Sequence, residues 1–420
     1  MTLELDEQTV MEPAFGWTLL SADAIRQAEA RLREDAQGVR DEIGFMYLHQ
    51  AYADRFFPGT SVQHTRLRYA LFVPWIYQRI AAFDLRKRRE SSIEKLVLDE
   101  EVRLTGRLLN SGESEGVIGR RVYPQRRASS QPATMVYWSA LTAWGLLRRL
   151  QDGSFPSRAV VHRMLSSDWR QLRVHDDDGT PIEEAHSVFA NLPPPPAEWF
   201  NPSAPITFKL REAERGFLRR QLLTTRKPSG EASLLARLAE QPGLIETATA
   251  PWSKGVSGIA DAEDRAALER ARRAAALAAI GRGLYAALVE EMRDGRDRVS
   301  TTMRHRTNLR EVIARYRDKA LELDVASLYQ DVPGLPPLFL AVLTKTQRWL
   351  QDERSPQELL EVYASAERKR KGNRTRLGFK GLERQKRAEW DNEKHPLATP
   401  LHYRWPIVRR MLLDLEDYAG

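Results

Sequence analysis

Ten lysines and arginines within 22 residues are the part of this sequence best suited to binding chemistry. Between positions 366 and 387 only Glu367 and Glu383 oppose them, so the segment carries 10 − 2 = +8. The formal net charge of the whole 420-residue chain is also +8, so the remaining residues sum to zero. Clustered cations attract polyanions, most often the phosphates of nucleic acids. We therefore predict phosphate contacts from Arg368, Lys369, Arg370, Lys371, Arg374, Arg376, Lys380, Arg384, Lys386 and Arg387.

A second set of cations follows an acidic amino-terminal part. Residues 1–78 hold 7 basic and 11 acidic side chains, whereas residues 79–127 hold 12 basic and 8 acidic ones. Either the two parts pair within the molecule, or each is a separately solvated face. On the nucleic-acid hypothesis the footprint extends to Arg86, Lys87, Arg88, Arg89, Arg120, Arg121, Arg126 and Arg127.

Aromatic residues are interleaved with the cations of the carboxy-terminal quarter. Exposed rings can stack on unpaired bases, each contributing about 1–3 kcal/mol. Buried rings would instead fix the last helix in the core. The sequence leaves both interpretations open for Phe379, Trp390, Tyr403 and Trp405.

The residue types that usually carry catalysis are missing or unsuitably spaced. The chain has no cysteine, and its eight histidines include no pair at the i, i+3 or i+4 spacing of a helical metal site. The run His175-Asp176-Asp177-Asp178 offers ligands for a divalent cation, but a solvated acidic turn has the same composition. Neither a GxxxxGK[ST] phosphate loop nor a GxSxG elbow is present. We expect no metal, no cofactor and no catalytic activity from the chain itself.

Composition indicates a soluble protein of the cytoplasm. Hydrophobic residues make up 42% and charged residues 29%, which is typical of folded rather than disordered chains. The opening MTLELDEQTVMEP is acidic and lacks the apolar core of a signal peptide. The most apolar window, ALFVPWIY, ends after eight residues, far short of the roughly 18 that a membrane span needs.

Apolar residues recur at helical spacing along most of the chain, so we predict a mainly α, multi-domain fold with few short strands. Leu67, Leu71 and Trp75 would form one buried stripe, with Pro74 expected to kink or break that helix. The strongest helix signal spans 261–292, where acidic residues occupy the first turn and alanines fill the middle.

Two further predicted helices, at 134–150 and 157–165, are separated by Asp152-Gly153. A helix, a short glycine-containing turn and a second helix form the outline of a helix-turn-helix, although many helical hairpins share it. The second helix would present to a DNA groove Ser157, Arg158, His162 and Arg163.

Aspartate and proline clusters interrupt the helical pattern between 174 and 205, so we place a linker there. The predicted divisions are an amino-terminal helical domain at 1–173, this linker at 174–205, a helical domain at 206–365, and a basic segment with a closing helix at 366–420.

Several separated patterns carry a resemblance. They are Phe15-Gly16-Trp17, Phe57-Pro58-Gly59-Thr60-Ser61, Thr65-Arg66-x-Arg68-Tyr69-x-x-Phe72-Val73-Pro74-Trp75-x-Tyr77, Gly116-Val117-Ile118-Gly119, Tyr137-Trp138-x-x-Leu141-x-x-Trp144-Gly145, Arg211-Glu212-Ala213 and Tyr403-Arg404-Trp405. Together they resemble an uncharacterised bacterial family known only as a domain of unknown function. That family is similar to genes of anti-phage defence clusters, beside helicases, phospholipase-D-like nucleases and DNA methyltransferases. The resemblance implies a defence setting and brings no catalytic residues with it.

These observations predict a non-catalytic DNA-binding or scaffolding component of a bacterial anti-phage defence system, with a helicase, nuclease or methyltransferase as partner. A metal-dependent nuclease with dispersed acidic ligands and a protein–protein adaptor are the alternatives. The three hypotheses differ in what the fold must bring together. DNA binding needs a continuous basic surface, a nuclease needs three or more acids beside a lysine, and an adaptor needs a large exposed apolar patch.

Overall fold

A computed structural model describes residues 41–166, 188–352 and 355–419 of the protein, and those from Glu42 onward belong to one compact unit. The α-helices are α2 (Phe45–Phe56), α3 (Tyr69–Ala81), α4 (Leu85–Glu90), α5 (Ile93–Asn110), α6 (Ala133–Val136), α7 (Trp138–Ala143), α8 (Arg158–Ser166), α9 (Ala197–Phe200), α10 (Glu212–Leu223), α11 (Leu234–Glu240), α12 (Lys254–Ile259), α13 (Ala262–Gly295), α14 (Arg304–Leu321), α15 (Leu328–Asp331), α16 (Pro337–Asp352), α17 (Leu360–Lys371), α18 (Gly381–Ala388) and α19 (Trp405–Glu416).

Short 3-10 helices and one strand pair complete the fold. The 3-10 helices are η1 (Tyr123–Gln125), η3 (Pro242–Ile245), η4 (Pro356–Leu359) and η5 (Gly372–Arg374). The strands β1 (Leu210–Arg211) and β2 (Tyr418–Ala419) pair in parallel, with Leu210 opposite Tyr418. Helices therefore dominate the described residues, which confirms the predicted mainly α class.

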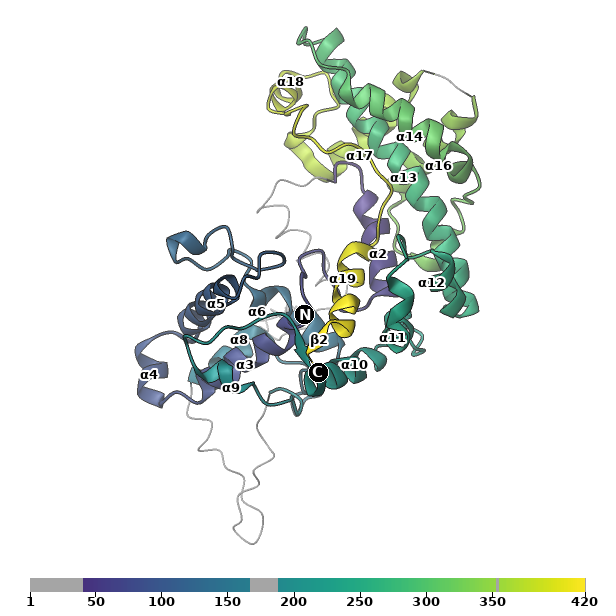
Figure 1. Ribbon diagram of the computed structural model, residues 1–420. Helices are drawn as coiled ribbons and strands as arrows, with labels where there is room; N and C mark the ends of the chain where they lie inside the picture. Colours follow the sequence, from purple (N-terminus) through teal and green to yellow (C-terminus); the bar gives the residue numbers. More distant parts are fainter. Residues whose placement is uncertain (1–40, 167–187, 353–354, 420) are drawn as a thin grey trace, which may run out of the picture. The chain divides into compact units, whose positions relative to one another are not determined.

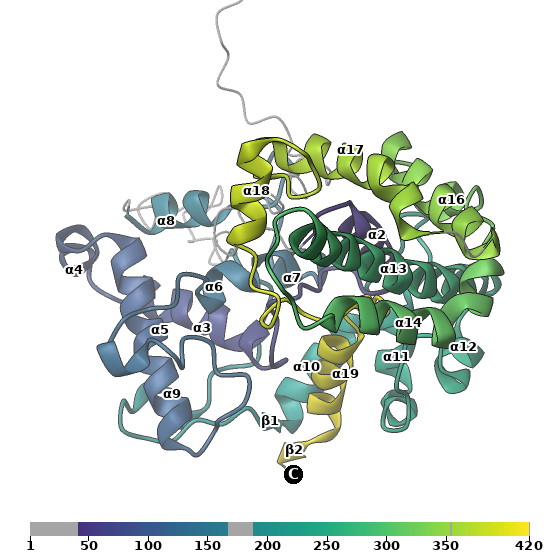
Figure 2. The same ribbon diagram turned by 90° about the horizontal axis from the view of Figure 1, so that it is seen from above.

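The longest helix, α13, begins and packs as its sequence predicts. The carboxylate of Asp261 accepts a hydrogen bond from the backbone N–H of Asp264 and so caps the first turn. Its small residues let neighbours approach closely, and α14 lies along it (Figure 1, Figure 2). A side chain at Gly281 would collide with the ring of Phe45. Gly281, and Gly283 beside Val312 and Leu309, therefore serve helix packing.

Helix α3 passes through Pro74, so the predicted break does not occur. Proline removes one backbone hydrogen bond and costs roughly 3 kcal/mol inside a helix. Burial offsets that cost, because every residue from Tyr69 to Tyr77 is buried. Trp75 is fully buried, as predicted, and its indole N–H donates to the Pro193 carbonyl at 3.1 Å.

The predicted helix-turn-helix is wrong, because α7 ends at Ala143 instead of near Leu150. Gly145 has a φ of +70°, and Leu147 then forms an antiparallel bridge with Phe189. A segment of 14 residues, 144–157, therefore separates α7 from α8, where a helix-turn-helix needs a turn of about 3–4. In α8, His162 bonds the Tyr77 hydroxyl at 3.0 Å, while Arg163 is exposed.

The described part of the predicted linker packs against the rest of the fold. Phe189 and Trp199 are buried, and Trp199 lies edge-on to Trp75 with a ring-centroid distance of 5.4 Å. Residues 167–187, which include the whole aspartate cluster Asp176–Asp178, lie outside the described residues. The boundaries predicted after 173, 205 and 365 fall within the span of the single compact unit.

Candidate nucleic-acid interface

The basic segment folds into three short pieces. Its first cations form the last turn of α17, where the negative end of the helix dipole favours positive charge. Gly372, with a φ of +53°, ends that helix. The chain then passes through η5 and enters α18, which packs against α13. Cations that are close in sequence consequently face different surroundings.

Arg387 is an internal residue. Its side chain is 1% exposed and donates to both carboxylate oxygens of Asp297, at 2.7 and 2.8 Å. The same guanidinium also donates to the carbonyls of Arg376 and Gly378. The hydrogen bonds from Arg387 to the Asp297 carboxylate hold the pKa of Asp297 below its usual value. Arg387 therefore joins α18 to the end of α13.

Two buried glutamates organise the turn between α17 and α18. Glu367 accepts from the Tyr285 hydroxyl at 2.7 Å and from the backbone N–H groups of Arg376 and Leu377 at 2.9 and 2.8 Å. Glu42 pairs with Arg376 at 3.2 Å and Lys371 at 3.3 Å. Burial also lowers the pKa of Lys371. Lys371 and Arg376 thus already have carboxylate partners inside the protein.

Five of the ten predicted cations are exposed, and five are buried or partly covered. Arg370 lies over the Tyr47 ring at 5.0 Å, and Lys386 pairs with Glu389 at 2.7 Å. The exposed cations, which keep their side chains available to a ligand, are Arg368, Lys369, Arg374, Lys380 and Arg384.

An exposed aromatic ring lies in the same segment of the chain as these cations. Phe379 is 61% exposed, and the guanidinium of Arg296 lies 4.4 Å from its ring centroid. Lys380 follows it directly in sequence, and Leu382, on the next turn, is 46% exposed. Arg384 is 68% exposed and reaches only to 3.8 Å from Asp297. We call Arg296, Phe379, Lys380, Leu382 and Arg384 the α18 surface.

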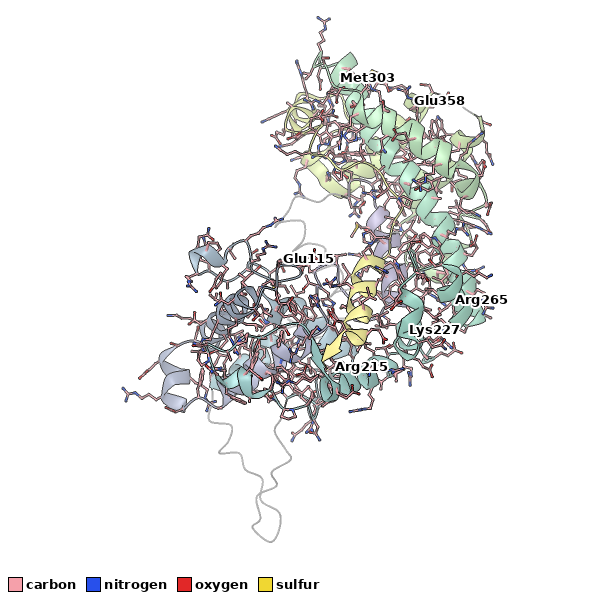
Figure 3. All side chains as sticks on the ribbon, viewed as in Figure 1. Glu115, Arg215, Lys227, Arg265, Met303 and Glu358 are labelled. Atoms are coloured by element: carbon pink, nitrogen blue, oxygen red, sulfur yellow. The ribbon has the colours of Figure 1, made fainter. Side chains whose placement is uncertain are left out.

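The α18 surface contains one cation that sequence reasoning missed. Arg296 belongs to the short run Arg293-Asp294-Gly295-Arg296-Asp297-Arg298, in which two aspartates hide the basic character. The turn after it exposes Val299 and Met303, and Met303 is labelled at the α13–α14 connection in Figure 3. An interrupted charge pattern of this kind gives no signal without the fold.

The other three aromatics of the carboxy-terminal quarter are core residues. Trp390 is 3% exposed, Tyr403 0% and Trp405 2%. Tyr403 donates from its hydroxyl to the Ala271 carbonyl at 2.8 Å, and Trp405 donates to the Ala248 carbonyl at 3.2 Å. Of the four predicted candidates, only Phe379 is exposed.

The second predicted set of cations also divides. Arg88 is buried and donates to the carbonyls of Phe83 and Leu165, while Arg86 is exposed and pairs with Glu90 at 2.6 Å. The side chains of Lys87 and Arg89 lie outside the described part of the structure. The loop between α5 and α6 exposes Arg120, Arg121, Arg126 and Arg127.

Three acids do converge beside a lysine, at the first turn of α13. The Lys227 ammonium lies 2.9 Å from carboxylate oxygens of Asp261 and Glu263, and 3.8 Å from Asp264 (Lys227 is labelled in Figure 3). Burial opposes the charged form of Lys227, but its hydrogen bonds to Glu231, Asp261 and Glu263 outweigh burial and raise its pKa. Arg55 also pairs with Glu263 and Asp264, at 2.9 and 3.1 Å. The carboxylates therefore face the protein's own cations, and the cluster links α2 and the α10–α11 connection to the start of α13.

The residues that the structure describes contain neither a metal-binding cluster nor a membrane-spanning helix. Within them, no group of three or more histidines or carboxylates is arranged to hold a metal ion. His175 and Asp176–Asp178 fall in the range that the structure does not describe. None of the helices in residues 41–166, 188–352 and 355–419 combines the length and apolar character needed to cross a bilayer.

Comparison with known proteins places most of the chain in one group. A model described as a family of unknown function (DUF6361) matches residues 16–323, while the basic segment and Tyr403-Arg404-Trp405 lie beyond that match. No curated protein and no solved structure matches the chain. Because the family match covers well over half of the sequence, the protein belongs to the family of unknown function DUF6361.

Proposed function

We propose that this protein binds DNA through the α18 surface and the neighbouring exposed cations, and that it acts without catalysing a reaction of its own. The observation that carries the proposal is the exposed Phe379 ring, flanked by Arg296 and followed by Lys380 and Arg384. A large apolar side chain at 61% exposure has little value for folding, whereas a ring among cations suits a ligand that has both bases and phosphates.

The cations provide affinity and the ring provides base contact. Each phosphate that a lysine or arginine neutralises releases bound counterions, which makes affinity depend steeply on salt. Five exposed cations of the basic segment correspond to about 5 phosphate contacts, hence a slope of log K on log salt of roughly −4 to −5. Stacking of one base on Phe379 adds about 1–3 kcal/mol.

The sequence resemblance supports an anti-phage setting in the cytoplasm. Proteins that recognise or hold DNA in such systems work beside a helicase, a nuclease or a methyltransferase, so we propose one of these as the partner that carries the catalytic step. Nuclease and adaptor functions remain as alternatives. The carboxylates at Lys227 do not favour the nuclease, because Lys227, Arg55 and Arg237 already occupy them.

The test is DNA binding by fluorescence anisotropy over a salt series. The variant Lys380→Glu/Arg384→Glu should weaken binding and reduce the salt slope by about 2, since two contacts are lost. The matched control is Arg220→Glu/Arg310→Glu, which changes the charge equally at two exposed arginines on α10 and α14. Equal weakening by both variants, or binding that is indifferent to salt, would refute the α18 surface as the DNA site.

Catalysis is tested on the same preparation. The purified protein should neither hydrolyse ATP nor cut DNA in the presence of magnesium or manganese. DNA cleavage that persists through purification and stops on adding a chelator would establish the nuclease alternative instead. Pulldown of the natively expressed chain, with and without nuclease treatment, separates a DNA-mediated partner from the direct protein contact of an adaptor.

A further inference from the structure

The loop between α5 and α6 forms an open pocket with the chemistry of a phosphate site. The pocket has a volume of about 530 Å³, within the roughly 300–1,000 Å³ typical of small-molecule sites. Its lining includes Arg120, Arg121, Ser129 and Ser130. Two guanidinium groups and two hydroxyls are the donors with which proteins hold phosphate oxygens.

Side chains of α5, of α3 and of the segment just before α3 hold this loop in place. The Thr65 hydroxyl donates to the Gly116 carbonyl at 2.7 Å, and the Ile118 N–H donates to the Tyr69 hydroxyl at 2.9 Å. The Thr105 hydroxyl donates to the Ile118 carbonyl at 3.0 Å. Three separate side chains thus fix the backbone just before the two arginines. Because the loop is already ordered, a ligand that binds there pays little entropy to order it.

Glycine is required at position 116, where the loop meets the pattern Thr65-Arg66-x-Arg68-Tyr69 at the start of α3. Gly116 has a φ of +77°, and a Cβ there would lie 2.7 Å from Cγ of Arg66. Arg66 is itself buried against Asp414. The pattern Thr65-Arg66-x-Arg68-Tyr69 therefore supports the GVIG loop directly, and both lie inside the residues that the family model matches.

We propose that this pocket binds a nucleotide through its phosphate group. Arg121 and Arg120 take the phosphate, and Val117 and Val122 offer apolar wall for the base or sugar. Glu115, also in the lining and labelled in Figure 3, is an acceptor for a ribose hydroxyl or a base amino group. A carboxylate beside two arginines disfavours free inorganic phosphate and favours a phosphate that carries hydrogen-bond donors.

The site is distinct from the α18 surface, so its test uses no DNA in the first instance. Binding of AMP, adenosine and inorganic phosphate to the full chain is measured by isothermal calorimetry. AMP should bind. Adenosine should bind at least about tenfold more weakly because it lacks the charge-assisted phosphate contacts, and inorganic phosphate at least about tenfold more weakly because it lacks the contacts of base and sugar with Val117, Val122 and Glu115. Failure of AMP to bind, or equal binding of adenosine or of inorganic phosphate, overturns the proposal.

Variants locate the ligand within the loop. Arg121→Ala should weaken AMP binding by about tenfold or more. It is preferred over Arg120→Ala, because Arg120 also donates to the Ser114 carbonyl within the loop. The matched control is Arg126→Ala/Arg127→Ala, which removes two exposed arginines of the same loop that do not line the pocket. Equal weakening by the control would show general attraction by the loop and would overturn the pocket assignment.

Two further measurements are needed. The first distinguishes this site from the DNA site, and the second distinguishes a free nucleotide from the phosphorylated end of a nucleic-acid strand as the natural ligand. The Lys380→Glu/Arg384→Glu variant should bind AMP as the wild type does, whatever its effect on DNA; loss of AMP binding in that variant overturns the separate site. A 5′-phosphorylated oligonucleotide that competes with AMP, where its 5′-hydroxyl counterpart does not, identifies a strand end as the natural carrier of the phosphate. Competition by neither identifies the free nucleotide.

Discussion

Arg66 and Asp414, 348 positions apart in the chain, form a buried ion pair. Nε of Arg66 lies 2.9 and 3.1 Å from the two carboxylate oxygens, and the backbone N–H of Leu67 donates to the same carboxylate at 2.8 Å. The side chains are 8% and 3% exposed. Arg68 makes a similar buried pair with Glu214 at 2.7 Å. The two arginines of the motif thus connect the start of α3 to α19 and α10, and their role is architectural.

Asp414→Ala should lower the free energy of unfolding by about 3–5 kcal/mol, because it removes the carboxylate nearest to the buried Arg66 charge and leaves Glu113 at 3.7 Å. Urea denaturation measures the change. The matched control is Asp417→Ala, three residues on, whose carboxylate is 59% exposed and faces Lys209 at 3.4 Å. Exposed pairs contribute about 0–1 kcal/mol. Similar losses in both variants would contradict a structural role for the Arg66–Asp414 pair.

Arg387→Ala and Arg384→Ala should behave oppositely although they lie three positions apart on α18. Arg387→Ala removes a buried bidentate partner of Asp297 and should cost about 3–5 kcal/mol of stability. Arg384→Ala, at an exposed position, should change stability by less than about 1 kcal/mol and weaken DNA binding. Thermal melts and anisotropy on the same samples distinguish them; normal folding of Arg387→Ala would argue against the internal assignment.

Phe379→Ala should weaken binding of single-stranded DNA by about 1–3 kcal/mol, because one stacked base is lost. Duplex DNA, whose bases are already stacked on each other, should lose much less. The salt slope should stay unchanged, since no cation is removed, and Phe379→Trp should retain binding. An equal loss on both forms of DNA would mean that the ring acts through packing rather than through base stacking.

His64 should make the protein less stable as the pH falls below about 6.5. Its Nδ1 accepts from the Ser61 N–H at 3.3 Å and its Nε2 lies 3.0 Å from the Val136 carbonyl, a pattern that only the neutral ring satisfies. Burial lowers its pKa from 6.5 to about 3. The unfolded chain then binds more protons than the folded one, so stability is complete above pH 6.5 and declines toward pH 3.

Urea melts at pH 7 and pH 5.5 measure this effect, which should be about 1 kcal/mol from His64 alone. Comparison with His64→Gln isolates it, because other groups titrate too. Burial raises the pKa of Asp414 to about 6. The contribution of Asp414 to stability is therefore present at low pH and lost as the pH rises, which is opposite to the pH dependence that His64 causes. If His64→Gln and the wild type lose the same stability between the two pH values, the His64 assignment is wrong.

The sequence alone determined the helical class, the long helix after Asp261, the burial of Trp75 and the place where positive charge is concentrated. Those features follow from local spacing and composition, which act over a few turns of chain. The helix-turn-helix predicted at 134–165 was wrong because a distant contact decides the path of the chain there. Leu147 forms a bridge with Phe189, which no local pattern shows.

Only the tertiary structure decided which cations face solvent. Asp297 lies 90 positions from Arg387, and Glu42 lies 329 positions from Lys371, so no local pattern could show that these carboxylates take up those charges. The same holds for the aromatics, where Phe379 faces outward and Trp390 inward within one basic segment. Whether a charge or a ring is available to a ligand depends on its surroundings in space, and those are set by residues that come together only on folding.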